Sequence, residues 1–147
     1  MNPSEVLRTF ILADPALAAA LGTRVYPIKL PQTVTYPAMT IQKISGSALA
    51  PLKGRASLAR PRFQCDVWTR EGDGNASAEV QRIGQLLSDR LEGAVFTVQD
   101  EDVSPAEALI VALEFDNDQE TYETDVEGGF FRYRADYFIH HQTGHGT

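Results

Sequence analysis

Three histidines near the C-terminus are the side chains best suited to hold a metal ion. His140, His141 and His145 lie close together in the sequence, and a neutral imidazole is a common metal ligand. Neighbouring residues of a strand point to opposite faces of a sheet, so His140 and His141 cannot readily share one ion. We therefore expect no metal site and interpret these residues as a solvated strand end.

The acidic run EFDNDQETYETDVEGG offers a second candidate, a calcium-binding loop. Counted from Asp116, acids occupy the first, third, fifth and twelfth positions, as in an EF-hand. The sixth position, where the sharp turn requires glycine, holds Thr121, and the flanks are typical of strands where an EF-hand needs helices. A solvated turn or a surface that faces a partner is the better interpretation of this run.

Nucleophilic catalysis and phosphate binding find little support in the sequence. Cys65, the only cysteine, lies in an apolar alternation that is typical of a buried thiol, and a single cysteine excludes internal disulfides. The glycine-rich turn TREGDGN lacks the Walker lysine and the spaced glycines of dinucleotide-binding loops. We expect no catalytic residue, no cofactor and no enzyme activity.

The charges are segregated along the chain. The net charge is −7; residues 15–65 contain seven basic residues and no acid, whereas residues 91–131 contain twelve acids and no lysine or arginine. If the two segments lie on different sides of the domain, copies would associate head to tail into a ring or a filament. If they form neighbouring strands, the charges cancel within one chain. The sequence leaves both alternatives open.

Eight of these charged residues are the assembly interface that we predict. They are Lys53, Arg55, Arg60, Arg62, Asp116, Asp118, Glu120 and Glu123. The basic members could also contact nucleic acid, but four bases in a chain of net charge −7 favour only weak, salt-sensitive binding. Specific DNA binding is not expected.

The N-terminus predicts two short helices or one kinked helix. Asn2 before Pro3 is typical of an N-cap followed by a first-turn proline. Asp14 and a second proline then start another short helical turn, which ends at Gly22. Prolines keep residues 23–36 in a non-helical connector. The segment has neither a signal peptide nor the roughly 18 apolar residues of a membrane span, which predicts a soluble, cytoplasmic product.

Five segments alternate between apolar and polar residues as strands do. They are residues 38–44, 60–69, 95–98, 108–115 and 130–140. A long loop, residues 45–59, separates the first two, and long loops in compact domains are usually functional or disordered.

One long helix is predicted between Asn75 and Gly93, with Val80, Ile83, Leu87 and Leu91 on one stripe. The fold class is therefore α+β: a mostly antiparallel sheet of about five strands, on which an N-terminal helical segment and one long helix pack. Residues 1–147 form a single domain, in which residues 142–147 are a frayed tail.

The order and spacing of several segments carry a family resemblance. ADPALAAALGTRVYP is followed by PQTVTYPAMTIQKISG, by RFQCDVWTR, by the long helix and by YRADYFIHH. This succession resembles the tail completion proteins of long-tailed bacteriophages, also called tail-to-head joining or tail terminator proteins. The similarity spans nearly the whole chain, and gene transfer agents carry similar proteins at this position.

The resemblance implies a structural virion protein without catalytic residues. Such subunits assemble, typically as a hexameric ring, at the head-proximal end of the tail, after synthesis in the bacterial host cytoplasm. The ring stops polymerisation of the tube and meets the head connector, while DNA passes through without specific binding. The implied partners are further copies of the chain, the tail tube protein and a head connector or stopper protein. Residues 45–59 would form a contact arm.

Two other functions remain open. The chain could be a head-tail adaptor or stopper at the same junction, or a small metal-independent hydrolase. Loss of a terminator predicts overlong tails, loss of a stopper predicts DNA leaking from complete heads, and a hydrolase would show turnover that one polar-to-alanine change abolishes.

Overall fold

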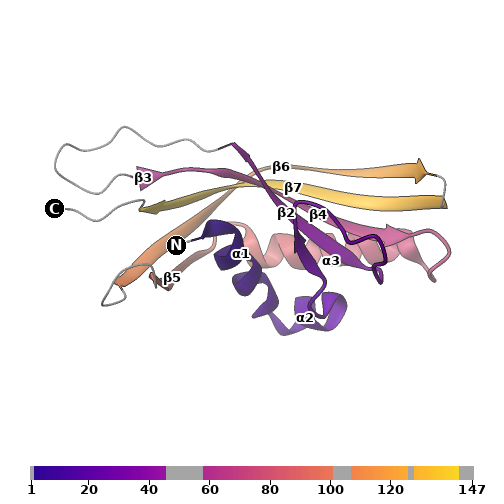
Figure 1. The fold of residues 1–147 in the computed structure, drawn as a ribbon, viewed down its shortest axis with the longest axis horizontal. Coiled ribbons are helices and arrows are strands. Elements are labelled where there is room, and N and C mark those ends of the chain that lie inside the picture. Colours follow the sequence, from indigo (N-terminus) through magenta and orange to yellow (C-terminus); the bar gives the residue numbers. More distant parts are fainter. Residues whose placement is uncertain (1, 46–57, 101–106, 126–127, 143–147) are drawn as a thin grey trace.

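The structure is a computed structural model that describes residues 2–45, 58–100, 107–125 and 128–142. The helices and strands, in chain order, are α1 (Pro3–Leu12), α2 (Pro15–Leu21), β1 (Val25–Pro27), β2 (Ala38–Ser45), β3 (Leu58–Ala59), β4 (Arg62–Arg70), α3 (Ala76–Leu91), β5 (Val95–Asp100), β6 (Glu107–Asp125) and β7 (Gly128–Gln142). All three helices lie on one face of a curled sheet (Figure 1). This confirms the predicted α+β class.

The two N-terminal helices begin where the sequence places their caps. The Asn2 side chain accepts a hydrogen bond from the backbone N–H of Ser4 at 3.1 Å, and the Asp14 side chain accepts one from Ala16 at 2.9 Å. Each cap precedes a proline at the first helical position, where the missing N–H costs nothing. The segment is therefore two helices, not one kinked helix.

Helix α3 packs its predicted apolar stripe on the sheet. Val80, Ile83, Leu87 and Leu91 are all buried. The approach to the sheet is close at Gly84, where an added Cβ would lie 2.9 Å from the ring of Tyr133 on β7. A helix that approaches a strand this closely requires a residue without a side chain.

The sheet has the strand order β1-β2-β4-β7-β6-β5, with short β3 pairing β7 beside them. The long strands pair antiparallel: β2 with β4, β4 with β7, β7 with β6, and β6 with β5. The five predicted strands correspond to these five. Residues 58–59 of the predicted loop form β3, and most of that loop lies outside the described residues.

Strand β1 was not predicted. Val25–Pro27 pairs parallel with Met39–Ile41 of β2, at the edge of the sheet. The prolines around it indicated a connector. Proline is tolerated on an edge strand, however, because the side that lacks the N–H faces solvent and no neighbouring strand needs that donor. The last predicted boundary also shifts, because Gln142 belongs to β7 and residues 143–147 lie outside the described part of the chain.

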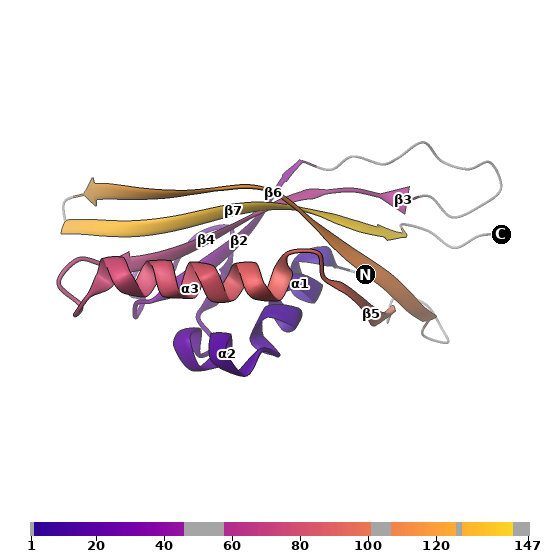
Figure 2. The same cartoon turned by 180° about the vertical axis from the view of Figure 1, so that it is seen from behind.

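Strand β6 is much longer than predicted. It continues through the acidic run to Asp125 and pairs with β7 from Ala112 to its end. The interpretation of this run as a solvated turn is therefore wrong. The pairing shifts register between Phe115 and Asn117, so Asp116 is the extra residue of a β-bulge. The first part of β6 pairs with β5 and curls away toward the helices (Figure 2).

Candidate assembly surface

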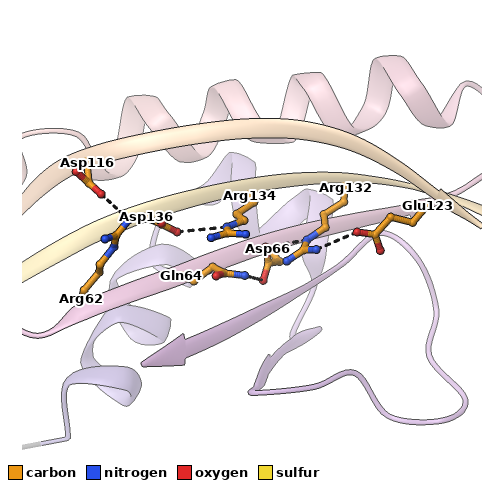
Figure 3. Close-up of polar contacts among 8 residues, drawn as sticks. All are labelled: Arg62, Gln64, Asp66, Asp116, Glu123, Arg132, Arg134 and Asp136. Carbon is orange, nitrogen blue, oxygen red and sulfur yellow. Dashed lines mark hydrogen bonds and ion pairs between the residues drawn. The ribbon is translucent and has the colours of Figure 1, made fainter. Parts of the chain in front are cut away.

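A network of charged side chains lies on the face of the sheet opposite the helices (Figure 3). Alternation along β4 places Arg62, Gln64 and Asp66 on this face, and alternation along β7 does the same for Arg132, Arg134 and Asp136. The register sets Gln64 opposite Asp136 and Asp66 opposite Arg134. Strand pairing thus brings residues from distant parts of the chain into contact.

One half of the network centres on Arg62. Its Nη2 lies 2.7 Å from Oδ2 of Asp136 and 2.7 Å from Oδ2 of Asp116 on β6. The hydrogen bond to Asp136, together with the charge of Asp116, raises the pKa of the Arg62 guanidinium. The second oxygen of Asp136 lies 3.7 Å from Nε of Arg134.

The other half centres on Asp66. Its Oδ1 accepts from Nε of Arg132 at 3.1 Å, and its Oδ2 accepts from Nε2 of Gln64 at 2.7 Å. Arg132 also donates to Oε1 of Glu123 at 3.0 Å. The same guanidinium lies 4.8 Å from the centre of the Trp68 ring, which adds a cation–π contact.

The two central carboxylates of this network are buried although no helix among the described residues covers them. Asp66 and Asp136 are 4% and 1% exposed. The long arginine side chains over these carboxylates exclude water with their aliphatic parts, and each carboxylate is paired, as a buried charge must be. The ion pairs join β4, β6 and β7 on this face of the sheet.

A separate group of charged side chains lies at the far end of the same face. Glu114 of β6 is 3.3 Å from Nη2 of Arg60 and 2.8 Å from Nε2 of His140. The hydrogen bond with His140 and, next, the contact with Arg60 hold the pKa of Glu114 below its usual range. His140 is thus tied to a carboxylate, whereas the adjacent His141 is buried, and His145 lies outside the described residues.

The eight predicted interface residues divide into three groups. Arg60 and Arg62 pair with acids of their own chain, so their charges cancel as the second alternative of the sequence analysis requires. The four acids contact their own chain too. Asp118 accepts a hydrogen bond from Tyr133, and Glu120 accepts one from Gln81. Asp116 and Glu123 form ion pairs with Arg62 and Arg132. Lys53 and Arg55 lie outside the described residues. The interface itself stays a prediction.

The two edges of the sheet nonetheless differ in charge. The segment without acids, residues 15–65, forms the edge strands β1 and β2, where Lys29 and Lys43 are exposed. The segment without lysine or arginine, residues 91–131, forms the opposite edge, β5 and β6. One edge is therefore basic and the other acidic.

A groove that the sequence did not reveal lies between α1 and β5. Its volume is about 380 Å³, and its wall contains Val6 and Phe10 of α1 and Phe96 and Val98 of β5. The rings of Phe10 and Phe96 stack with centroids 4.0 Å apart. Phe10 lines this open groove only because α1 meets a strand far along the chain.

Metal and thiol chemistry find no site in the described part of the chain. No three histidine, cysteine or acidic side chains there are grouped as metal ligands. Cys65 is fully buried, and burial raises the pKa of its thiol. Among the described helices, none has the length and apolar character needed to cross a membrane.

Comparison with known proteins assigns the family. The family model described as tail completion protein gp17 matches residues 5–137. The chain belongs to this family. It is therefore a structural tail protein of a virion, as the resemblance of its sequence motifs indicated.

A solved structure shares the fold. A chain of the "Virion of native gene transfer agent (GTA) particle" superposes with a TM-score of 0.59 at 20% sequence identity, over 93% of this chain and 92% of that chain. No curated protein matches the sequence.

Proposed function

We propose that copies of this tail completion protein join side by side into a closed ring at the head-proximal end of the tail. The ring terminates the tail tube and joins it to the head connector. Membership of the tail completion family supports this role. The observation that carries the proposal is the opposite charge of the two sheet edges.

Opposite edges of one molecule favour a heterologous contact. Such a contact uses two different surfaces of each copy, and it closes into a ring when its rotation divides a circle. The basic β1–β2 edge and the acidic β5–β6 edge supply such a pair of surfaces. Complementary charge fixes orientation and speeds encounter more than it adds affinity, so assembly should weaken as salt rises.

The net charge of −7 suits a ring through which DNA passes. Like charges repel over about 8–10 Å at physiological salt. Phosphates would therefore not adhere to acidic residues on the inner surface. The expected partners are the tail tube protein and a connector or stopper protein of the head.

Deletion of the gene, with complementation by variants, tests this function. We expect overlong tails without the protein, because nothing stops the tube, and electron microscopy of purified protein with tail tubes should show a ring at one tube end. Normal tails with DNA leaking from complete heads would indicate a stopper instead.

The predicted interface is tested in the same experiment by the double variant Lys53→Glu, Arg55→Glu. These two residues are preferable to Arg60 and Arg62, whose replacement would break ion pairs within the chain. Failure to restore tail length, with normal folding by circular dichroism, supports a contact arm. Full complementation would contradict it.

A further inference from the structure

Ile28, directly after β1, has an unusual backbone and an exposed side chain. Its φ is +70°, a left-handed conformation that is an outlier for a β-branched residue. Its backbone N–H donates to the carbonyl of Ile41 at 2.9 Å, and its side chain is 67% exposed. A strained residue with a largely exposed apolar side chain often has a function.

The groove between α1 and β5 is the apolar surface that such a side chain fits. Val6, Phe10, Phe96 and Val98 line it, and exposed apolar surfaces of this kind mark sites of interaction. The stacked rings of Phe10 and Phe96 lie at 7° to one another. The stacked pair closes the groove between helix and strand with apolar surface.

One copy cannot fill its own groove, because the two features lie on opposite sides of α1. Arg8 of α1 holds the segment that leads into β1, donating to the carbonyls of Val25 at 3.1 Å and Thr23 at 3.2 Å. At 3.6 residues per turn, Arg8 points about 160° away from both Val6 and Phe10. Ile28 on one side therefore meets a groove only on another molecule.

Charge favours the same occupant. Lys29, next to Ile28, is exposed and forms no ion pair with any described residue. Glu5 lines the groove and is exposed too. Strand β5 on the far wall belongs to the segment without lysine or arginine. A cation that follows an apolar side chain would thus meet an acid beside an apolar groove.

We propose that Ile28 of one copy docks into the groove between α1 and β5 of a second copy of this chain, with Lys29 beside Glu5. The contact is heterologous, so each copy inserts its Ile28 into one neighbour and binds the Ile28 of another neighbour in its own groove. This proposal rests on the proposed function and assigns the residues through which the ring closes.

Cysteine cross-linking tests the contact directly. The variants are Ile28→Cys and Thr9→Cys, the latter on the exposed wall of the groove. Both are treated with a short bismaleimide under conditions in which electron microscopy shows assembled protein. Buried Cys65 stays in place and does not react in the folded chain. A mixture of the two single variants should give covalent dimers, the double variant should give a ladder of larger species, and each single variant alone should give neither.

The controls separate this contact from the ring itself. Ser77→Cys, at the exposed start of α3, replaces Thr9→Cys and should not cross-link to Ile28→Cys. Assembled protein in which Ile28→Cys and Thr9→Cys fail to link overturns the docking and leaves the ring intact. Ile28→Cys linking to itself indicates a two-fold contact and also overturns it. Wild-type protein that never assembles, alone or on tail tubes, overturns the proposed function.

A glycine variant gives an independent readout. Ile28→Gly removes the apolar side chain and relieves the strain of the left-handed backbone. The unfolding temperature of the isolated subunit should therefore stay the same or rise. The dissociation constant of assembly should rise at least about tenfold, the loss expected for one buried isoleucine side chain. Gln85→Gly, at an exposed position in the middle of α3 and away from both sheet edges, should do the reverse: it should lower stability by about 1 kcal/mol and leave assembly normal. Assembly of Ile28→Gly at wild-type affinity would overturn the docking.

Discussion

At the scale of single residues, two carboxylates show how burial decides the value of an ion pair. Asp116 and Asp136 each place an oxygen 2.7 Å from Nη2 of Arg62. Their side chains are 32% and 1% exposed. The pairs have the same length and partner atom, and differ in access to water.

We expect Asp136→Ala to lower the free energy of unfolding by about 3–5 kcal/mol, because it leaves the partly buried arginines without their shared anion. Asp116→Ala should cost about 0–1 kcal/mol, as for an exposed pair. Urea unfolding at neutral pH measures both. Equal costs would show that the environment of Asp136 is not drier than that of Asp116.

These pairings could not be predicted from the sequence. The charge order of the chain is evident, but Arg62 and Asp136 are 74 residues apart, and only the β4–β7 register brings them together. Arg60 and Arg62 were therefore predicted at an interface between copies, whereas the structure shows them holding acids of their own sheet. Cys65 could be interpreted locally, because apolar alternation directly indicates burial.

At the scale of elements, the helices were predictable because their signals are local. Asn2, Asp14 and Asn75 are caps, and each lies within three residues of the N–H that it binds. The second half of β6 gave no such signal. Its residues are polar on both faces, since Asp118 and Glu120 face α3 while Glu123 faces away, so no alternation of apolar residues marks it as a strand.

One arginine ties α1 to α3. Nε and Nη2 of Arg90 donate to the carbonyl of Phe10 at 3.0 and 2.9 Å, and the guanidinium lies 3.7 Å from the centre of the Phe10 ring. That carbonyl is one of the last in α1 and has no partner within the helix. Arg90 therefore supports the wall of the groove between α1 and β5.

We expect Arg90→Lys to destabilise the protein by about 1–2 kcal/mol, because an ammonium keeps the charge and loses the two-pronged donor and the planar stack. Arg82→Lys is the matched control, since among the described residues Arg82 pairs with Glu79 of the same helix and its replacement should change stability by less than about 0.5 kcal/mol. Thermal unfolding of both variants decides whether the helix-to-helix contact carries the cost.

At the scale of the whole molecule, two tyrosines of the core set the response to alkali. Burial raises the pKa of Tyr133 and of Tyr137, and for Tyr133 the hydrogen bond to Asp118 adds to the effect. An unfolded tyrosine ionises near pH 10. As pH rises past this value the unfolded chain loses these protons first, so the contribution of the two tyrosines to stability is constant below about pH 10 and is lost above it.

This alkaline unfolding is measured by following phenolate absorbance and circular dichroism together as the pH is raised. Tyr133 and Tyr137 should ionise only as the protein unfolds. In Tyr137→Phe the alkaline midpoint should move to higher pH, since this hydroxyl is buried without a hydrogen-bond partner among the described residues and its loss removes a titrating group. An unchanged midpoint would show that Tyr137 does not drive alkaline unfolding.

The candidate site was predictable only in part at this scale. The order of charges along the chain is evident in the sequence, but it left open whether residues 15–65 and 91–131 would lie on different sides or neutralise each other. The groove depends on the contact between α1 and β5. Phe10 and Phe96, which make this contact, are more than 80 residues apart, and only tertiary packing brings them together. The exposed, left-handed Ile28 has no sequence signal, because most residues adopting that conformation are glycine, asparagine or aspartate.

The bulge at Asp116 has a genetic consequence. Beyond it, Tyr122 faces the helices and packs on Phe131, while Glu123 faces away and binds Arg132. Loss of the single codon for Asp116 would remove the extra residue, so that Asn117 follows Phe115 directly and every later side chain of β6 keeps its present face. Related genes can therefore lose this one codon without reversing the strand, whereas one codon lost or gained beyond the bulge would move the residues that follow it to the opposite face.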